Sequence, residues 1–397
     1  MLPLEEAQSR LLALAPRLRT ENVDVASALG RYLLEPLKAR RTQPAAHVSA
    51  MDGYAVTGPD LAGPWTVIGE SAAGHPFAGS IEPGQAVRIS TGALMPAGAD
   101  AVILQEDIVR AGERIELTGT PPSPPGKHIR RCGSDFALDH ELLPAGARIG
   151  PAQLALAIAA GHKHLPVRRV PHVVIIDSGD ELAEDPELCP AHQVPASNGA
   201  MIAALLAANP CTVSRIGPVR DDLEALARAF HDARDADVVV TTGGASVGDH
   251  DLIRPAIEQA GGTLDFWKVA IKPGKPLLVA TRGAQVILGL PGNPVSSHVT
   301  AFLFLLPLLR ASLGAGQPLP CPIPLPLASA MQPGGDRREF LRGRLSDGGV
   351  EVLTQQDSGA LAAMAAAQVL IDRPAGSPAR HAGEKVDVHF LGNGGIA

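Results

Sequence analysis

The chain has 397 residues, a length that predicts roughly two to four domains. Apolar residues make up 45% and charged residues 19%, so several buried cores are expected and global disorder is excluded. Aromatic residues make up only 3%, and the net charge is −7 without a long basic run. Binding to nucleic acid is therefore not expected.

The termini and the cysteines narrow the class of protein further. The four cysteines are far apart and form no C-x-x-C motif, so neither a zinc knuckle nor a disulfide framework is predicted. The first residues include Glu5 and Glu6 and lack a basic segment, which argues against a signal peptide. The longest apolar run, residues 299–309, is too short to span a bilayer. We expect a soluble, cytoplasmic protein without membrane contact.

The first half of the chain begins with a helix and continues as a β-rich region. Leucines recur at helical spacing over residues 4–19 and predict an amphipathic helix. Gly/Pro turns then separate short β-rich runs, which predict a small β domain of antiparallel character. These runs are residues 65–70, 85–91, 100–109 and 114–117. A proline-rich connection at residues 121–126 and a helix from Pro151 to Gly161 follow.

Residues 168–312 alternate between strand and helix patterns. Strands are predicted over 170–176, 211–217, 237–241 and 285–290. Helices are predicted over 199–208 with Ser197 and Asn198 as a cap, from Asp221 to about 234, over 251–260, and after 294. This alternation predicts an α/β fold with a doubly wound, mostly parallel sheet. After about residue 316 the pattern is β again, and we expect a C-terminal β-barrel-like domain.

Acidic residues cluster where the predicted strands end. Ligands of open parallel sheets bind beyond the carboxyl ends of the strands. The acidic residues at these ends are Asp177, Asp180, Glu181, Asp221, Asp222, Asp249 and Asp251. Carboxylates that converge on one rim repel one another unless a cation neutralises them, and Mg²⁺ prefers oxygen ligands. The sequence therefore predicts a magnesium site held by Asp180, Glu181, Asp221 and Asp251.

Glycines, lysines and a proline turn complete the predicted site. The loop TTGGASVG contains Thr242, Gly243, Gly244 and Ser246, whose backbone N–H groups could hold a phosphate. The segment WKVAIKPGKP adds Lys268, Lys272 and Lys275, and the turn PGNP adds Pro291, Asn293 and Pro294. Acidic metal ligands, phosphate-binding glycines and lysines together predict a Mg²⁺-dependent site for a phosphorylated ligand or an oxyanion.

Each signal also has a purely structural alternative. Asp221 could serve only as a helix N-cap. Asp180 and Glu181 could be ordinary loop acids, the glycines could form only a tight turn, and the lysines could be a solvated face. The coincidence of all these signals at strand ends favours the functional interpretation.

Five longer motifs carry a family resemblance. They are SAMDGYAV at 49–56, RISTGALMPAGADAVILQED at 88–107, the TTGGASVGDHD loop, FWKVAIKPGKP at 266–276 and GLPGNPVS at 289–296. In order and spacing the chain resembles the molybdopterin molybdenumtransferases, which share their fold with the C-terminal region of gephyrin. The resemblance covers nearly the whole chain.

The resemblance implies roles for individual residues. Asp52, Thr91 and Asp135 match functionally important positions in and just after the small β domain. Glu181, Asp221 and Asp251 match the acidic set of the sheet domain, and the three lysines and the PGNP prolines match the segments that face the ligand. Arg337 matches a C-terminal arginine that helps to hold molybdate.

The resemblance also implies an architecture and a reaction. Four domains are expected: a helical linking domain (1–44 with 137–167), an inserted β domain (45–136), an α/β molybdopterin-binding domain (168–315) and a C-terminal β domain (316–397). The implied reaction inserts molybdate into adenylylated molybdopterin and releases AMP. A homodimer with composite active sites is implied, with other proteins of molybdenum-cofactor biosynthesis as further partners.

The match has departures, and two other functions remain open. Ala46 and His47 replace the usual aromatic and acidic residues before MDGYAV, Ser178 replaces Thr, and Ala363 stands where Ser is expected. The alternatives are adenylyl transfer to molybdopterin, which stand-alone sheet domains catalyse, and a non-catalytic pterin-binding scaffold of gephyrin type.

Overall fold

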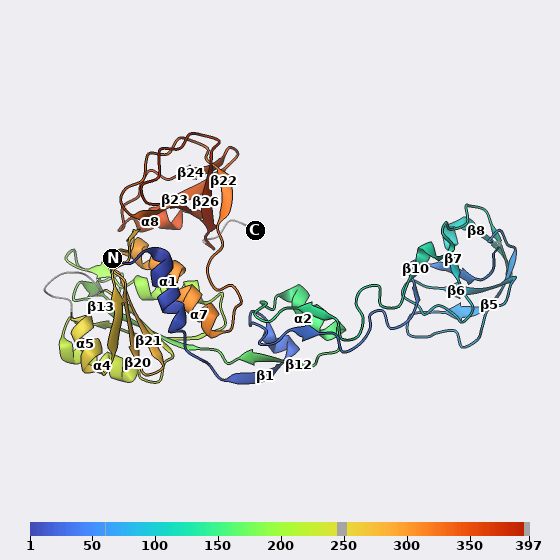
Figure 1. The fold of residues 1–397 in the computed structure, drawn as a ribbon, viewed down its shortest axis with the longest axis horizontal. Helices are drawn as coiled ribbons and strands as arrows, with labels where there is room; N and C mark the ends of the chain where they lie inside the picture. The colour runs from blue at the N-terminus through green and yellow to red at the C-terminus, as the bar shows by residue number, and fades with distance from the viewer. Residues whose placement is uncertain (60, 244–251, 393–397) are drawn as a thin grey trace.

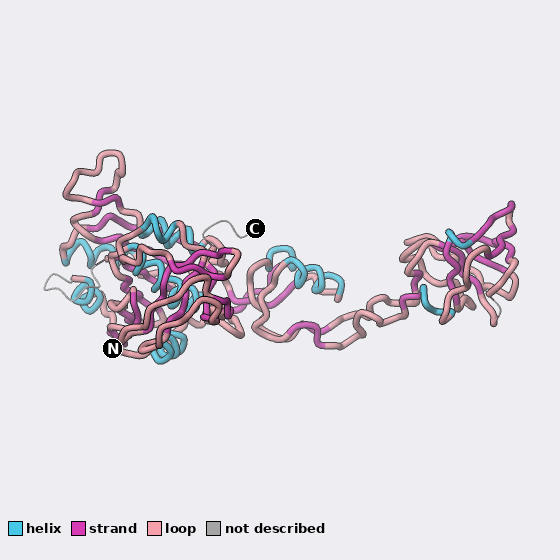
Figure 2. Tube along the Cα trace, turned by 90° about the horizontal axis from the view of Figure 1, so that it is seen from above, coloured by secondary structure: helices cyan, strands magenta, loops and turns pink. Residues whose placement is uncertain are grey.

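The computed structural model describes residues 1–59, 61–243 and 252–392. The molecule is elongated and contains four units (Figures 1 and 2). A sheet unit (172–312 with the first helix) and a C-terminal unit (323–390) lie together at one end. A narrow middle unit (20–38 with 141–168) joins them to a β unit (48–130) at the other end.

The sheet unit contains six strands between two layers of helices. Their spatial order is β16 (Thr212–Val219), β13 (His172–Ser178), β17 (Val238–Thr242), β21 (Gln285–Leu290), β20 (Leu278–Arg282) and β18 (Thr263–Trp267). The first four strands are parallel, and β20 is antiparallel to both of its neighbours. The predicted doubly wound, mostly parallel sheet is therefore confirmed, although the sequence predicted neither β18 nor β20.

Buried apolar side chains cover both faces of this sheet. On one face the strands pack against α1 (Leu4–Ala13), α3 (Asn198–Leu206), α6 (Pro294–Thr300) and α7 (Leu306–Ser312). On the other face they pack against α4 (Leu223–Asp232) and α5 (Ile253–Gln259). Strands β13, β17 and β21 are buried along their whole length or nearly so, as expected for a sheet covered on both sides.

The first helix differs from its prediction in length and in position. It ends at Ala13 instead of continuing to residue 19, because Pro16 disfavours helical backbone at Ala15 and its ring would clash with the preceding turn. Leu4 and Leu11 lie in the same buried cluster as Val173 of β13. The helix thus packs on the sheet unit and not with residues 137–167.

One buried hydrogen bond explains how α1 meets the core. Helices α6 and α7 are continuous through a π-helical turn, η4 (Ala301–Leu305). Pro307 has no N–H to donate to the carbonyl of Leu303 four residues earlier. The buried Gln8 of α1 donates to that carbonyl from Nε2 at 3.0 Å. The amide therefore satisfies an acceptor that the proline leaves without its helical donor.

The run Pro294–Ser312 meets the length and composition criteria for a membrane span. The sequence prediction had considered only its apolar part and judged it too short. In the structure 89% of this run is buried inside the protein. It is the core helix of the sheet unit.

The middle unit consists mainly of paired strands. Its elements are β1 (Thr20–Asp24), η1 (Val25–Ala28), β2 (Leu37–Lys38), β11 (Glu141–Leu143), α2 (Pro151–Ala159) and β12 (His164–Arg168). Antiparallel pairs β1–β12 and β2–β11 bring together segments more than 100 residues apart. The β unit is thus inserted between two segments of the chain that run side by side.

The β unit is a six-stranded sheet. In spatial order it contains β7 (Ala101–Leu104), β4 (Gly53–Val56), β6 (Gln85–Ile89), β5 (Trp65–Ser71), β9 (Arg114–Leu117) and β8 (Ile108–Ala111). Short helices η2 (Gln105–Asp107) and η3 (Pro125–His128) and the pair β3 (Val48–Ser49) and β10 (Ile129–Arg130) complete it. All of these pairs are antiparallel except β5–β6, which agrees with the predicted antiparallel character.

The C-terminal unit is a curled sheet that incorporates part of the sheet unit. Its strands are β19 (Ile271–Lys272), β23 (Arg338–Ser346), β25 (Val369–Arg373), β26 (Lys385–Phe390) and β22 (Ile323–Pro326), with β24 (Gly349–Val352) beside β23 and the helix α8 (Leu361–Ala365). A bridge between Leu327 and Val350 brings the two ends of the sheet together. Strand β19 lies between β18 and β20 in the chain but pairs with β23. This strand pair joins the sheet unit to the C-terminal unit.

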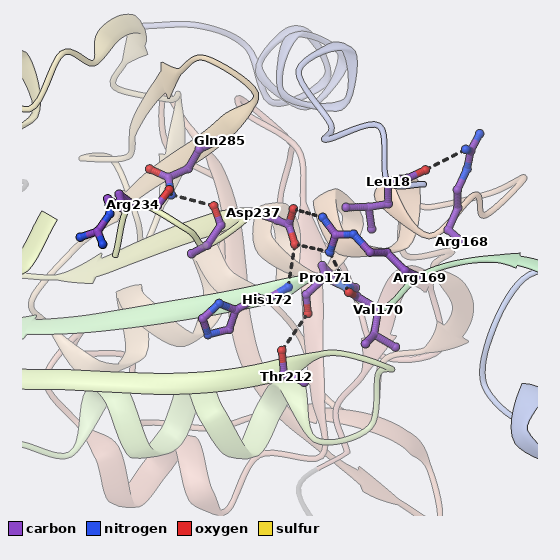
Figure 3. A network of polar contacts seen from close by, with 11 residues as sticks. Leu18, Arg168, Arg169, Val170, Pro171, His172, Thr212, Arg234, Asp237 and Gln285 are labelled. Carbon is purple, nitrogen blue, oxygen red and sulfur yellow. Dashed lines mark hydrogen bonds and ion pairs between the residues drawn. The ribbon is translucent and has the colours of Figure 1, made fainter. Parts of the chain in front are cut away.

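A polar network fixes the point where the middle unit enters the sheet (Figure 3). The guanidinium of Arg169 donates to both carboxylate oxygens of Asp237 at 2.6 and 2.7 Å, and the backbone N–H of His172 donates to the same carboxylate at 2.8 Å. Burial alone would raise the pKa of Asp237, but these hydrogen bonds hold it below its ordinary value. The charged pair thus ties the start of β13 to the segment before β17.

We predict that Gln8→Ala lowers the free energy of unfolding by about 2 kcal/mol, because it leaves the buried carbonyl of Leu303 without its side-chain donor. In a Pro307→Ala background the restored backbone N–H can satisfy the same carbonyl, so the loss should shrink to below about 1 kcal/mol. Urea unfolding of the four proteins in this double-mutant cycle measures the difference. An equal loss in both backgrounds would contradict this interpretation.

Candidate functional site

A cavity of about 800 Å³ lies at the carboxyl edge of the parallel strands. Its lining residues come from the ends of β13, β17 and β21, from the start of α3 and from the C-terminal unit. They are Asp177, Ser178, Glu181, Leu182, Val194 to Asn198, Thr242, Gly243, Pro276, Pro291 to Pro294, Gly359 and Leu361. This size is typical of pockets for small organic ligands.

The buried carboxylate of Asp177 organises the floor of this cavity. Asp177 is 2% exposed and accepts a hydrogen bond from the Thr242 hydroxyl at 2.6 Å. The guanidinium of Arg215 donates to the other carboxylate oxygen at 3.0 Å. Because these partners belong to β17 and β16, one carboxylate of β13 ties together three neighbouring strands at the edge where the ligand would bind.

Two glycines permit the close packing around that carboxylate. A Cβ at Gly199 in α3 would collide with Oδ2 of Asp177. Gly243 has φ +107°, and a Cβ there would collide with the carbonyl oxygen of Ser178. The predicted role of Gly243 in phosphate binding therefore coincides with a structural need for glycine.

The cavity wall contains features suited to an anion. Helix α3 begins at Asn198 and the helix of α6 begins at Pro294, and both starts line the cavity. Helix N-termini carry partial positive charge and favour anionic groups. The hydroxyl of Ser178 is buried and has no hydrogen-bond partner within the described residues.

The predicted acidic residues separate into two places. Glu181 lines the cavity, whereas Asp180 lines a neighbouring hollow beyond the same loop. Asp180 and Asp221 lie side by side: the backbone N–H of each donates to the carboxylate of the other, at 3.4 and 3.3 Å. Neither these two carboxylates nor Glu181 is in an ion pair in the described part of the chain.

Two details of the helix starts differ from the predictions. Asp222, not Asp221, caps α4, and its side chain accepts a hydrogen bond from the backbone N–H of Ala225 at 2.8 Å. Ser197 precedes α3, but its backbone is already helical and its side chain makes no capping hydrogen bond. Asn198 instead donates to the carbonyl of Gly292 at 2.7 Å, across the cavity wall. The N-cap alternative for Asp221 is therefore wrong.

Part of the predicted site lies outside the described residues. This part comprises Gly244, Ser246, Asp249 and Asp251. Within residues 1–59, 61–243 and 252–392, no three His, Cys, Asp or Glu side chains are grouped so that they could hold a metal ion.

The C-terminal unit supplies one wall of the cavity. Asn293 of the PGNP turn donates to the Ser358 hydroxyl at 3.0 Å, and the N–H of Val295 donates to the Ser358 carbonyl at 3.1 Å. The fully buried Arg342 donates to the carbonyls of Gln355 and Asp357 at 2.8 and 3.0 Å. These contacts hold the loop of Ser358 over the strand ends.

The predicted basic residues lie beside the cavity and not in its lining. Lys272 forms an ion pair at 3.1 Å with Glu339, a buried carboxylate that also pairs with Arg373. The ammonium of Lys268 stacks on the Trp267 ring at 3.9 Å. Lys275 is exposed and has no ion pair within the described residues, and its neighbour Pro276 lines the cavity.

Arg337 also lies outside the lining. Its guanidinium donates to the carbonyl of Ile271 at 3.3 Å and lies 3.9 Å from the carboxylate of Asp336. The arginine is therefore next to the lysine segment, on the same side of the cavity.

The remaining predicted residues belong to the opposite end of the molecule. In the β unit, the backbone N–H and the hydroxyl of Thr91 donate to Oδ1 of Asp52 at 2.6 and 3.0 Å. These hydrogen bonds hold the pKa of Asp52 below its ordinary value, so the carboxylate stays ionised. Asp135 lines a separate hollow of about 470 Å³ between the β unit and the middle unit. Within one chain these residues and the strand-end cavity are not brought together (Figure 1).

Sequence reasoning missed several residues of the cavity. Asp177 was noted as a strand-end acid but was not chosen as a site residue, and Gly199 and Ser358 were not considered. Asp177 follows four consecutive buried β-branched residues, which is a signal that could have found it. Ser358 lies in a different unit, so only the tertiary structure reveals its position.

Comparisons with known proteins agree with this architecture. Residues 2–161 match the MoeA N-terminal region (domain I and II), residues 174–311 match a probable molybdopterin binding domain, and residues 324–391 match the MoeA C-terminal region (domain IV). A molybdopterin molybdenumtransferase of Haemophilus influenzae is 36% identical over 80% of this chain and 79% of its own length. That of Synechococcus elongatus is 35% identical over 94% and 95%. The chain belongs to the MoeA family.

The structures of this family have the same fold as the chain. The molybdopterin biosynthesis moeA protein from Pyrococcus horikoshii OT3 superposes with a TM-score of 0.83 at 27% identity, over 98% of this chain and all of that one. Gephyrin of Dictyostelium discoideum is 30% identical over 80% of this chain, which corresponds to half of gephyrin. The predicted family resemblance is confirmed.

We predict that Gly199→Ala destabilises the protein by about 2 kcal/mol through overpacking against Asp177. Helix propensity alone gives the opposite sign, a gain of about 1 kcal/mol for alanine within a helix. Thermal and urea unfolding therefore decide between the two effects by the direction of the change. A more stable variant would show that the approach of α3 to Asp177 is not a constraint.

Proposed function

We propose that this chain inserts molybdenum into molybdopterin: it binds adenylylated molybdopterin and molybdate and yields molybdenum cofactor and AMP. Membership of the MoeA family supports a transferase, as do the names of its curated relatives. The observation that carries the proposal is the strand-end cavity, which the starts of two helices line at the carboxyl edge of the parallel strands.

The described residues suit the parts of such a ligand. The starts of helices α3 and α6 would face the phosphates, since helix N-termini favour negative charge. Proline and leucine side chains would face the flat pterin, with Leu182, Pro276 and Pro291 among the lining residues. The bond that breaks is the phosphorus–oxygen bond that releases AMP. Glu181 would orient a water molecule or the metal ion at this bond.

Asp180 and Asp221 fit a magnesium ion in the chemistry of their donor atoms. Their carboxylates lie side by side and are not neutralised by an ion pair within the described residues, and Glu181, on the cavity side of the loop, is the third proposed ligand. Mg²⁺ in proteins is commonly held by one or two carboxylates together with substrate phosphates and water. When bound, it would screen the phosphates and polarise a phosphorus–oxygen bond. Asp251, which lies outside the described residues, is the fourth proposed ligand.

Lys272, Lys275 and Arg337 would attract molybdate to the side of the cavity that β19 and the C-terminal unit share. The buried Glu339 holds the Lys272 ammonium in place. The Lys275 ammonium has no ion pair within the described residues, whereas Lys272 is paired with Glu339. Lys275 is therefore the stronger candidate for direct contact with molybdate.

The working form in this proposal is a cytoplasmic homodimer. Asp52 and Thr91 belong to the β unit and Glu181 to the sheet unit, which are at opposite ends of one chain (Figure 1). In a two-fold dimer the β unit of one protomer would face the sheet unit of its partner, which gives two equivalent sites. Other proteins of molybdenum-cofactor biosynthesis would supply the substrate and receive the product.

We predict that Glu181→Gln lowers molybdate-dependent AMP release about 100-fold, because it removes a charge at the reacting phosphate without changing side-chain size. Glu187→Gln, an exposed acid six residues further along the chain and outside the cavity, is the matched control and should retain the wild-type rate. AMP is measured after incubation with adenylylated molybdopterin, Mg²⁺ and molybdate.

A parallel incubation with ATP, Mg²⁺ and molybdopterin separates the alternative functions. Formation of adenylylated molybdopterin there, without AMP release in the first assay, would indicate an adenylyltransferase. Binding of the pterin without either reaction would indicate a scaffold. Each of these results would contradict the proposal.

A second prediction concerns the shared site. Asp52→Asn and Glu181→Gln should each be nearly inactive alone. In a mixed dimer one site would collect both substitutions and the other would be wild type. Co-refolding equal amounts gives about half mixed dimers, so activity should recover to roughly a quarter of wild type. No recovery after demonstrated subunit exchange would mean that each site is built within a single chain.

A further inference from the structure

A second cavity, of about 630 Å³, lies where three parts of the molecule meet. Tyr32 and residues 144–148 of the middle unit form one wall, and Ala208, Asn209 and Arg310 of the sheet unit form another. Gly316 and Gln317, in the connection to the C-terminal unit, close it. It shares no lining residue with the strand-end cavity.

The charges of this junction cavity are unbalanced. Its lining contains two arginines, Arg148 and Arg310, and no carboxylate. Neither guanidinium is in an ion pair within residues 1–59, 61–243 and 252–392. Arg310 is partly buried, and its burial lowers the pKa of Arg310, as does the charge of Arg148, whereas Tyr32 acts in the opposite direction. Two cations thus face the same cavity without a carboxylate in its lining.

Most of the donor groups of these arginines remain available. The side chain of Arg310 makes one long hydrogen bond, to the Pro318 carbonyl at 3.4 Å, and Arg148 makes one, to the Ala208 carbonyl, also at 3.4 Å. A guanidinium presents five N–H donors in a planar fork that matches the oxygens of a phosphate. Arg310 lies in the last turn of α7, where a cation is favoured by the helix dipole, but Arg148 comes from another unit and has no such reason to be there.

We propose that the junction cavity binds a small phosphorylated molecule, with its phosphoryl group between Arg148 and Arg310. The Tyr32 hydroxyl and the side-chain amides of Asn209 and Gln317 line the same space and supply further hydrogen bonds. A phosphate ion alone is much smaller than the cavity, so an organic portion is expected to fill the remainder. The ligand would contact the middle unit, the sheet unit and the connection at once.

The site has a consequence for the shape of the molecule. The backbone N–H of Gly316 already donates to the carbonyl of Gly146 at 3.1 Å, which joins the same segments beside the cavity. A ligand bound there would add contacts across this junction, and the junction carries the β unit. Binding should therefore restrict the orientation of the β unit relative to the sheet.

The test is calorimetric titration of the full chain with inorganic phosphate, molybdate and AMP. We expect wild type to bind AMP at two sites, as the product in the strand-end cavity and as a ligand in the junction cavity, and Arg148→Gln and Arg310→Lys to weaken only the second about 10-fold through loss of a charge-assisted fork. Arg228→Gln, an exposed arginine on α4, is the control and should bind as wild type does. Arg148→Gln should keep the wild-type rate of AMP release, which separates this site from the reaction cavity.

Each outcome has a definite meaning. AMP binding tighter than phosphate binding, with both weakened in the two variants, supports the phosphorylated molecule. Equal affinity for AMP and the free oxyanions, lost in the same variants, would overturn the organic ligand in favour of an inorganic ion. Affinities that the two substitutions do not change would overturn the site itself.

Discussion

The carboxylate of Asp177 is the interaction on which the strand-end cavity depends. It is nearly inaccessible to solvent, and leaving it without partners would be strongly unfavourable. Thr242 and Arg215 satisfy it from the two neighbouring strands, and Gly199 allows α3 to approach it. The positions of β17, β16 and α3 at the cavity therefore follow from one buried charge.

The second constraint is the way in which the C-terminal unit is attached. Strand β19 leaves the sheet unit and pairs in parallel with β23, so that Ile271 lies opposite Arg338. This pairing places Glu339 beside Lys272 and brings the loop of Ser358 onto the PGNP turn. The cavity wall and the basic segment are consequently fixed by the same strand pair.

Local patterns in the sequence predicted much of the fold and part of the site. The runs of β-branched residues identified β13, β17 and β21, and the rule that ligands bind beyond parallel strand ends identified Glu181, Thr242, Gly243 and the PGNP turn. The early end of α1 could also have been read from Pro16. The position of α1 could not be read from the sequence. It depends on the hydrogen bond from Gln8 to the Leu303 carbonyl, which lacks its helical donor because of Pro307, almost 300 residues away. The same limit applies to Ser358, whose role arises only from its contacts with Asn293 and Val295 of another unit. Asp52 and Thr91 were identified by resemblance, and their hydrogen bonds hold the Asp52 carboxylate ionised on a unit remote from the cavity.

The most direct test is a crystal structure of the Glu181→Gln variant with adenylylated molybdopterin, since slowed turnover should preserve the ligand. The account predicts density in the strand-end cavity, with phosphates at the starts of α3 and α6 and the pterin against Pro276 and Pro291. It also predicts Asp52 of a partner subunit near the same phosphates. Ligand bound away from Asp177, Gly243 and Asn293 would contradict the assignment of this cavity as the reaction site.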